Sequence, residues 1–153
     1  MAGTSHIGKA GHLAAMAEFL LRGYNVAMQE VDLGDDIFVV HDTSGDLWRI
    51  QVKTAVGKPK QYGWSGQFIV GERQLATGKD PDLYYVLALR CERQWEFIIQ
   101  PRKRLFREYR DHEVGTLSNE AITFTVRCHA TDVLCSNRSW QRFRNTWPEW
   151  PML

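Results

Sequence analysis

The chain has 153 residues, which suffices for one domain with a sizeable hydrophobic core, and we take residues 1–153 as a single domain. Hydrophobic residues make up 44% and charged residues 24%, as in ordinary soluble globular proteins, and the net charge of +1 excludes a general electrostatic attraction of the whole molecule to nucleic acid or membranes. The N-terminus lacks the pattern of a secretion signal, and no apolar run approaches the length of a membrane span. We therefore expect a soluble cytoplasmic protein with no membrane partner.

The charges are distributed unevenly along the chain. Residues 30–46 contain six carboxylates and no lysine or arginine, whereas residues 90–110 contain seven basic side chains against three glutamates. A local acidic pocket beside a local basic surface suits a metal site that handles phosphates, although solvated charges that happen to cluster fit the counts equally well. The three cysteines, Cys91, Cys128 and Cys135, lack the paired spacing of a zinc site and suit free thiols in a reducing cytosol.

The first predicted element is a helix over residues 8–22, which Gly23 ends. Five apolar side chains fall at helical spacing and are expected to form its buried stripe: Leu13, Ala17, Leu20, Leu21 and Tyr24. Glu18 lies at the edge of this stripe. It is either a carboxylate that reaches into a cleft or a surface residue that pairs with Arg22 four residues later.

Two strands, over residues 37–40 and 47–54, follow a short strand over residues 25–31 and are joined by the turn-forming residues 42–46. A hairpin centred on Ser44 and Gly45 pairs positions whose numbers sum to 89. Asp36 then faces Lys53, and Phe38 faces Gln51. Because opposed residues of an antiparallel pair lie on the same side of the sheet, this pairing brings three polar side chains together.

The hairpin therefore has one polar and one apolar face. Asp36, Gln51 and Lys53 share the polar face, and four aliphatic side chains fill the other: Ile37, Val39, Ile50 and Val52. The same register sends Asp35 to the apolar side or into the preceding loop, which makes Asp36 the better functional candidate. A bulge of one residue would reverse that choice.

The rest of the chain alternates strands and helices. Residues 56–66 indicate a loop near the polar face, and residues 68–76 are ambiguous, with a helix starting near Glu72 as one interpretation. The continuous apolar run over residues 83–89 predicts a central strand buried on both faces. Residues 95–100 and 122–126 also read as strands, and Pro101 opens a basic helix that runs to about Tyr109. This order predicts a mixed α/β protein, and the tryptophans at 140, 147 and 150 are expected in a core or an interface.

The ordered combination of Glu18 on the first helix, Asp36 at the start of a strand and Gln51-Val52-Lys53 on the next strand resembles the PD-(D/E)XK nuclease superfamily. It looks like the branch in which glutamine replaces the acidic residue of the last motif, as in some group I intron homing endonucleases, and Holliday junction resolvases share the plan. The resemblance covers residues 8–110 and leaves 111–153 as a C-terminal extension. It implies a restriction-endonuclease-like α/β fold, a mixed central sheet flanked by helices.

The resemblance also implies an Mg²⁺-dependent endonuclease that hydrolyses DNA, with Mn²⁺ as a substitute. Phosphodiester hydrolysis needs a hard cation that neutralises the phosphate and lowers the pKa of an attacking water. The resemblance implies that Asp36, the side-chain oxygen of Gln51 and the carbonyl of Val52 bind the ion directly. Glu18 acts through water or on a second ion, and Lys53 orients the attacking water or stabilises the phosphate charge.

Partners follow from the same resemblance. DNA backbone contacts are expected from six basic residues: Lys58, Lys60, Arg102, Lys103, Arg104 and Arg107. A nuclease this small cuts both strands by pairing subunits, so we expect a homodimer or a higher homo-oligomer. Two alternatives stay open. Because Gln51 is neutral, the chain could be a non-cleaving DNA- or protein-binding module that retains the fold. It could also be a structural protein in which Lys53 merely pairs with Asp36.

Overall fold

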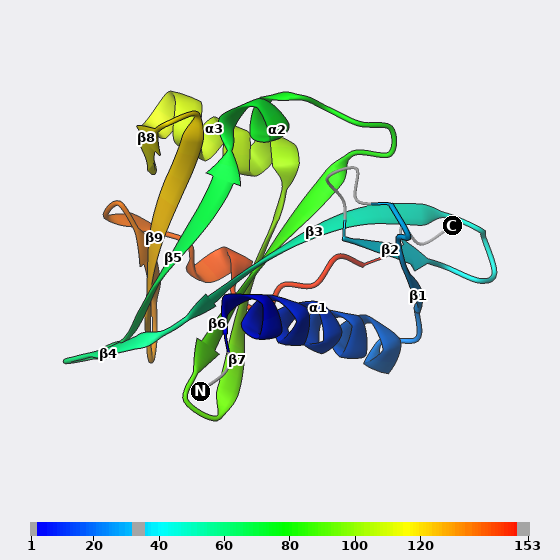
Figure 1. The fold of residues 1–153 in the computed structure, drawn as a ribbon, viewed down its shortest axis with the longest axis horizontal. Coiled ribbons are helices and arrows are strands. Elements are labelled where there is room, and N and C mark those ends of the chain that lie inside the picture. The colour runs from blue at the N-terminus through cyan, green and yellow to red at the C-terminus, as the bar shows by residue number, and fades with distance from the viewer. Residues whose placement is uncertain (1–2, 32–35, 150–153) are drawn as a thin grey trace.

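The computed structural model describes residues 3–31 and 36–149, and they form two β-sheets with three α-helices around them (Figure 1). The first sheet has the strand order β1-β2-β3-β6-β7 and is mixed, since β3 and β6 are parallel while the other neighbours are antiparallel. Its strands are β1 (Asn25–Met28), β2 (Ile37–Val40), β3 (Leu47–Val56), β6 (Leu83–Cys91) and β7 (Gln94–Pro101). This is the mixed α/β architecture that the sequence predicts.

The second sheet is antiparallel and was largely missed by the sequence prediction. Its order is β11-β10-β9-β5-β4, with β8 added to β9. Its strands are β4 (Lys58–Lys60), β5 (Gly63–Gly71), β8 (Thr116–Ser118), β9 (Ala121–His129), β10 (Val133–Cys135) and β11 (Arg138–Ser139). The loop expected over residues 56–66 is wrong, because β4 and β5 form a hairpin there. The helix expected near Glu72 is confirmed as α2 (Glu72–Ala76).

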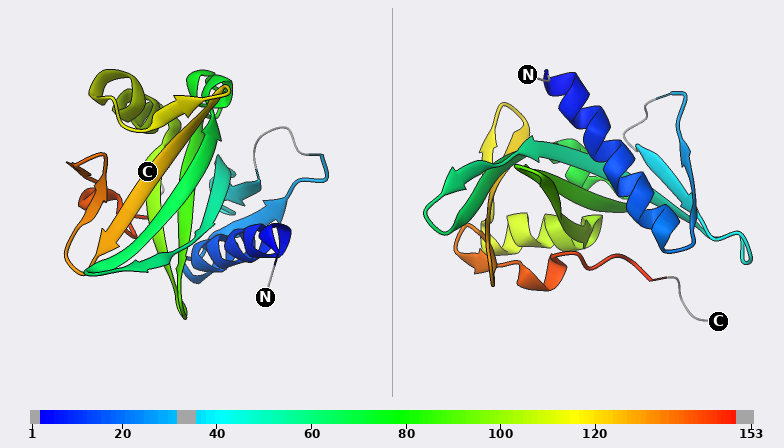
Figure 2. Two further views of the ribbon diagram at one scale, coloured as in Figure 1. Left: turned by 60° about the vertical axis from the view of Figure 1, so that its left-hand side comes forward. Right: turned by 90° about the horizontal axis from the view of Figure 1, so that it is seen from below.

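Helix α1 (Thr4–Leu21) lies along the first sheet (Figure 2), and the face that it buries differs from the predicted one. Its buried residues are Gly11, Ala15 and Phe19, whereas Leu13 and Leu21 are 52% and 81% exposed. The small side chains at positions 11 and 15 let the helix approach β3 closely: a Cβ atom on Gly11 would lie 2.1 Å from Oγ1 of Thr54. Close backbone approach, rather than the most apolar stripe, decides the orientation of α1.

The register of the β2–β3 hairpin differs by two positions from the predicted one. Ile37 pairs with Ile50 and Phe38 with Arg49, so paired positions sum to 87 instead of 89. The turn is centred one position earlier because Gly45 adopts a positive φ of 75° at its end rather than at its centre. A shift of two leaves every side chain on its predicted face. The apolar face is confirmed, since its four aliphatic side chains, Ile37, Val39, Ile50 and Val52, are buried.

Strand β6 separates two hydrophobic cores, as its continuous apolar run predicts. Val86 and Ala88 face the core under α1, and Tyr85, Leu87 and Leu89 face the core shared with the second sheet. Helix α3 (Arg102–His112) follows Pro101 as expected. Trp140 and Trp147 are buried in these cores, whereas Trp150 and Asp35 lie outside the described residues. None of the helices in the described part combines the length and apolar character needed to cross a bilayer.

Candidate functional site

Asp36 lies directly before β2, and β3 holds its carboxylate in place. The backbone N–H of Asp36 donates to the carbonyl of Ile50 at 2.8 Å. Its Oδ2 atom accepts the backbone N–H of Val52 at 2.7 Å and the side-chain Nε2 of Gln51 at 2.9 Å. Asp36 therefore lies against Gln51, two positions before its predicted partner Lys53. The shared polar face survives this change because the register shift is even.

Gln51 links Asp36 to helix α2. Its side chain is 6% exposed, and its Oε1 accepts Nε2 of Gln74, on α2, at 3.4 Å. The N–H and C=O groups of one strand residue point to the same edge, so the N–H of Val52 that reaches Asp36 also places the Val52 carbonyl at that edge. The edge of β3 beyond the start of β2 thus gathers a carboxylate, a side-chain amide and a main-chain carbonyl.

His12 is a site residue that the sequence reasoning missed. Its Nε2 atom lies 3.4 Å from Oδ2 of Asp36, and the two side chains are 25% and 11% exposed. Gly11 brings this turn of α1 onto β3, and His12 projects from the adjacent position towards the hairpin. The helical spacing of Gly11, Ala15 and Phe19 was the available signal. Small residues at this spacing indicate a closely packed helix face, and His12 lies next to it.

Glu18 does not reach this site. It lies later on α1, where its Oε2 accepts Nη1 of Arg22 at 2.6 Å. The sequence left two interpretations of Glu18 open, and in the structure Glu18 forms the local pair with Arg22. Helix α1 presents His12 rather than Glu18 to Asp36.

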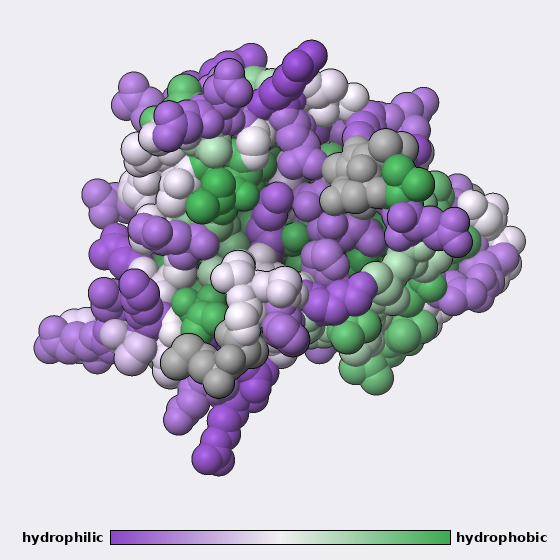
Figure 3. Space-filling model, in the orientation of Figure 1, coloured by the Kyte–Doolittle hydropathy of each residue, from purple (hydrophilic) through white to green (hydrophobic). Residues whose placement is uncertain are grey.

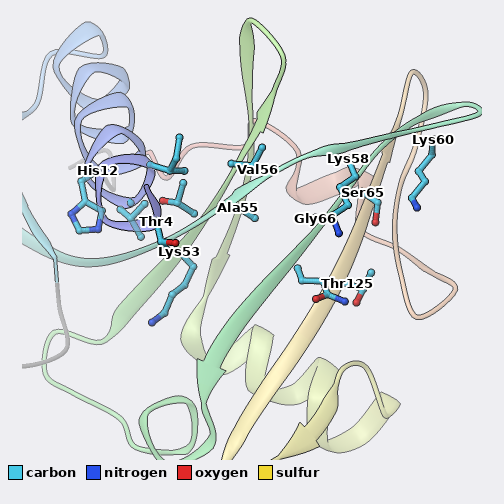
Figure 4. A pocket seen from close by; sticks show the side chains of 15 residues that line it. Thr4, His12, Lys53, Ala55, Val56, Lys58, Lys60, Ser65, Gly66 and Thr125 are labelled. Carbon is cyan, nitrogen blue, oxygen red and sulfur yellow. The ribbon is translucent and has the colours of Figure 1, made fainter. Parts of the chain in front are cut away.

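A groove of about 660 Å³ opens beside His12 between α1, β3 and the second sheet (Figure 4). Lys53 extends into it from β3, and Lys58 and Lys60 line it from β4. Among the fifteen residues that line the groove in the described part of the chain there is no aspartate or glutamate. Asp36 lines a smaller neighbouring cavity, and His12 and Gly8 border both. The site is therefore a cationic groove with one carboxylate at its margin.

The basic residues of α3 are arranged differently from the prediction. Arg102 is 5% exposed and donates to both carboxylate oxygens of Asp82, at 2.8 and 2.9 Å, and to the carbonyl of Leu75. These contacts correct its assignment as a DNA contact: it holds α3 to the loop before β6. Lys103 and Arg107 are exposed on α3 and Arg104 lies over the ring of Phe143, but none of them lines the groove.

Soft and acidic metal ligands do not cluster in the structure. The described residues contain no group of three or more His, Cys, Asp or Glu side chains arranged to hold a metal ion. The three cysteines are buried and unbridged, and burial raises the pKa of the Cys91 thiol to about 11 and that of Cys128 to about 12. Any cation bound near Asp36 would therefore have oxygen atoms and the His12 imidazole as its protein ligands.

Comparison with known proteins identifies the fold. No protein-family model and no curated protein sequence matches the chain. A solved structure of a bacterial homing endonuclease, I-Ssp6803I, is similar to it with a TM-score of 0.61 over 96% of this chain and 90% of that chain, at 21% sequence identity. The chain therefore has the mixed α/β fold of that homing endonuclease, and the likeness extends through the C-terminal residues beyond 110.

Proposed function

We propose that the protein is a metal-dependent endodeoxyribonuclease of the PD-(D/E)XK type, which hydrolyses phosphodiester bonds in DNA. The observation that carries the proposal is the placement of Asp36, Gln51 and Lys53 on one face of the β2–β3 hairpin, at the margin of a groove lined by lysines. The homing endonuclease with the same fold supports DNA as the substrate. A groove that is cationic and free of carboxylates among the described residues suits a polyanion.

The residues around Asp36 fit a hard divalent cation, Mg²⁺ or its substitute Mn²⁺. Asp36 would supply a carboxylate oxygen, Val52 its carbonyl, and Gln51 its side-chain oxygen once the amide turns over, because its nitrogen now faces Asp36. His12 adds an imidazole nitrogen, which Mn²⁺ accepts more readily than Mg²⁺. Mg²⁺ keeps several waters in protein sites, so a set of this size suffices.

The chain's own groups have distinct roles in this proposal. A bound cation would neutralise the scissile phosphate and lower the pKa of an attacking water. The N–H of Val52 orients the Asp36 carboxylate, and the amide of Gln51 does so until it turns over to the cation. Lys53, a compact point charge on the same face, orients the water or stabilises the charge that develops on the phosphate. Lys58 and Lys60 hold the DNA backbone farther along the groove.

Cleavage of plasmid DNA in the presence of Mg²⁺ or Mn²⁺ tests the proposal. We expect Asp36→Asn and Lys53→Ala each to lower the cleavage rate by at least a hundredfold, on the order of the contribution of one electrostatic catalytic group. Asp42→Asn, in the exposed turn of the same hairpin, is the matched control and should cleave at the wild-type rate. Cleavage that persists in both site variants would refute the assignment.

One observation favours a second candidate, a module that binds DNA without cleaving it. The carboxylate of Asp36 is already hydrogen-bonded to two protein N–H donors, and Gln51 brings no negative charge to the site. Titration calorimetry separates the candidates. Mn²⁺ binding at millimolar concentration supports the nuclease, whereas DNA binding with no detectable Mn²⁺ binding supports the module.

The expected homodimer has a candidate surface on α1. Leu13, Ala17 and Leu20 are exposed at the spacing of a coiled-coil seam, and this side of the helix is visibly apolar (Figure 3). We propose that a second copy of the chain packs on it, which would supply a second site for the second DNA strand. Light scattering should give twice the monomer mass for the wild type and the monomer mass for Leu20→Glu. A monomeric wild type would contradict this interface.

A further inference from the structure

We propose that four neutral polar side chains on the outer face of the second sheet, called here the reading face, recognise base edges of double-stranded DNA. They are Ser65, Gln67, Thr123 and Thr125. Lys58 and Lys60 beside the reading face hold the phosphates. This inference rests on the proposed function for the identity of the ligand, and it adds where sequence specificity resides.

The register of β5 and β9 builds the reading face. Gln67 pairs with Thr125, and the flanking pairs of the two antiparallel strands continue in step for nine residues on each strand. Along β5, Phe68 and Val70 are buried while Gln67 is exposed; along β9, Phe124 is buried while Thr125 is exposed. The alternation of a half-buried sheet thus directs Ser65, Gln67, Thr123 and Thr125 outward, and the exposed Ile69 and the half-buried Arg127 share this side of the sheet.

The reading face is continuous with the candidate site. Ser65, Gln67 and Thr125 line the same groove as Lys53 and His12, and Figure 4 shows Thr125 and Ser65 on the wall opposite β3. A duplex whose backbone lies at Lys53 would therefore pass directly over the reading face. Antiparallel strands can enter a DNA groove and present their side chains to the bases.

Specific DNA recognition requires both affinity for the backbone and discrimination between bases. The lysines suit the first task and the reading face suits the second. Lysine side chains are point charges that bind the phosphates of DNA of any sequence, and this binding releases counterions from the DNA. A glutamine amide offers one donor and one acceptor, the pair that adenine presents in the major groove, and serine and threonine hydroxyls can serve either role. The described groove also lacks carboxylates that would repel the backbone. The charged set would thus supply affinity and the neutral set specificity.

Selection of duplexes from a random-sequence library tests this division of roles. The full-length Asp36→Asn variant serves as the background, so that DNA is bound without being cut. We expect Gln67→Ala to lose roughly ten- to a hundredfold of the discrimination at one base position and to keep its affinity for random DNA. Lys58→Ala should weaken binding to all sequences alike and reduce the slope of log Kd against log salt by about 1. Gln94→Ala, an exposed glutamine on β7 outside the groove, should change neither.

The outcomes separate this inference from the nuclease proposal. If Gln67→Ala and Thr125→Ala both retain the wild-type base preference, or if the background protein binds DNA with no preference, the reading face is refuted while cleavage can still stand. If the wild type binds DNA selectively but does not cut it, and Gln67→Ala relaxes that selectivity, the reading face is supported and the nuclease proposal is refuted. Absence of any DNA binding refutes both.

Discussion

The side-chain amide of Gln51 donates a hydrogen bond of 2.9 Å to the carboxylate of Asp36. In a nuclease site with an acidic residue at this position, two carboxylates would face each other and need a cation between them. Here the neutral amide stabilises Asp36 without one. In the proposed metal site, the pair would therefore link the folding of the hairpin to the affinity for a cation.

Gln51→Glu should tighten Mn²⁺ binding and lower the stability of the metal-free protein. The added negative charge is expected to raise the Mn²⁺ affinity on the order of tenfold. Without metal, loss of the amide donor and repulsion from Asp36 should cost about 1–2 kcal/mol of the free energy of unfolding. Calorimetry and urea unfolding, each with and without Mn²⁺, measure both effects. A variant with unchanged Mn²⁺ affinity would show that no cation binds between these side chains.

Substitution of His12 should change the choice of metal. If the His12 imidazole is a ligand, His12→Ala removes a nitrogen that Mn²⁺ uses better than Mg²⁺. The ratio of cleavage rates in Mn²⁺ and Mg²⁺ should therefore fall several-fold, while the Mg²⁺ rate falls less. His41→Ala is the control, because this half-buried histidine in the hairpin turn lines neither the groove nor the cavity beside Asp36. An equal loss with both metals would indicate that His12 only positions Asp36.

Gly11→Ala should loosen the contact of α1 with β3. The new methyl group would meet Oγ1 of Thr54 at 2.1 Å and its Cγ2 at 2.8 Å, and overpacking of this kind costs about 1–3 kcal/mol. Gly8→Ala, one turn earlier, has nothing within 4 Å of the new Cβ and should stabilise the helix by up to about 1 kcal/mol.

Thermal unfolding of these variants with and without Thr54→Ala completes a double-mutant cycle. The second substitution removes the two nearest atoms, so it should restore much of the stability lost in Gly11→Ala and leave Gly8→Ala unaffected. Equal stabilities of the two alanine variants would contradict the close approach.

Arg102 and Lys103 are adjacent basic residues, and their replacement by alanine should affect the stability of the protein very differently. Arg102→Ala leaves Asp82 without its partner in a mostly buried pair and should cost about 3 kcal/mol of unfolding free energy. The stability of Lys103→Ala should stay within about 0.5 kcal/mol of the wild type, because its side chain is exposed. Urea unfolding gives both values. A stable Arg102→Ala protein with weaker DNA binding would restore the role first expected of Arg102.

Glu108 should make the protein sensitive to acid. Burial alone would raise the pKa of Glu108, but hydrogen bonds from Arg138, at 2.6 Å, and Trp140, at 3.3 Å, outweigh burial and hold the pKa below its ordinary 4.5. Because the folded pKa is lower than the unfolded one, the ionised carboxylate stabilises the fold above about pH 4.5, and this contribution is lost as the pH falls below that value.

Glu108→Gln should therefore lower stability at pH 7 and flatten its decline between pH 5 and pH 3. Urea unfolding across that range measures the decline, with the exposed Glu30→Gln as the control that keeps the wild-type slope. The role of Glu108 would be contradicted if the Glu108→Gln and wild-type curves ran parallel.

Local patterns in the sequence determined much of the scaffold. Alternation assigned the two faces of the β2–β3 hairpin, and because alternation has a period of two, the faces survived an error of two positions in the register. The continuous apolar run of β6 predicted its burial on both sides, and Pro101 marked the start of α3. These features depend on residues near one another in the chain.

The tertiary structure alone decided which residues meet. The leucines of α1 carry the stronger apolar signal, yet Gly11 and Ala15 are buried because they permit close packing on β3, and that packing brings His12 rather than Glu18 to Asp36. Strand β5 and the burial of Arg102 likewise depend on distant partners, β9 and Asp82. Sequence alone thus specified the polar face that carries Asp36, Gln51 and Lys53. The remainder of the site depended on contacts between elements, because the free energy of packing is set by shape and distance as well as by hydrophobicity.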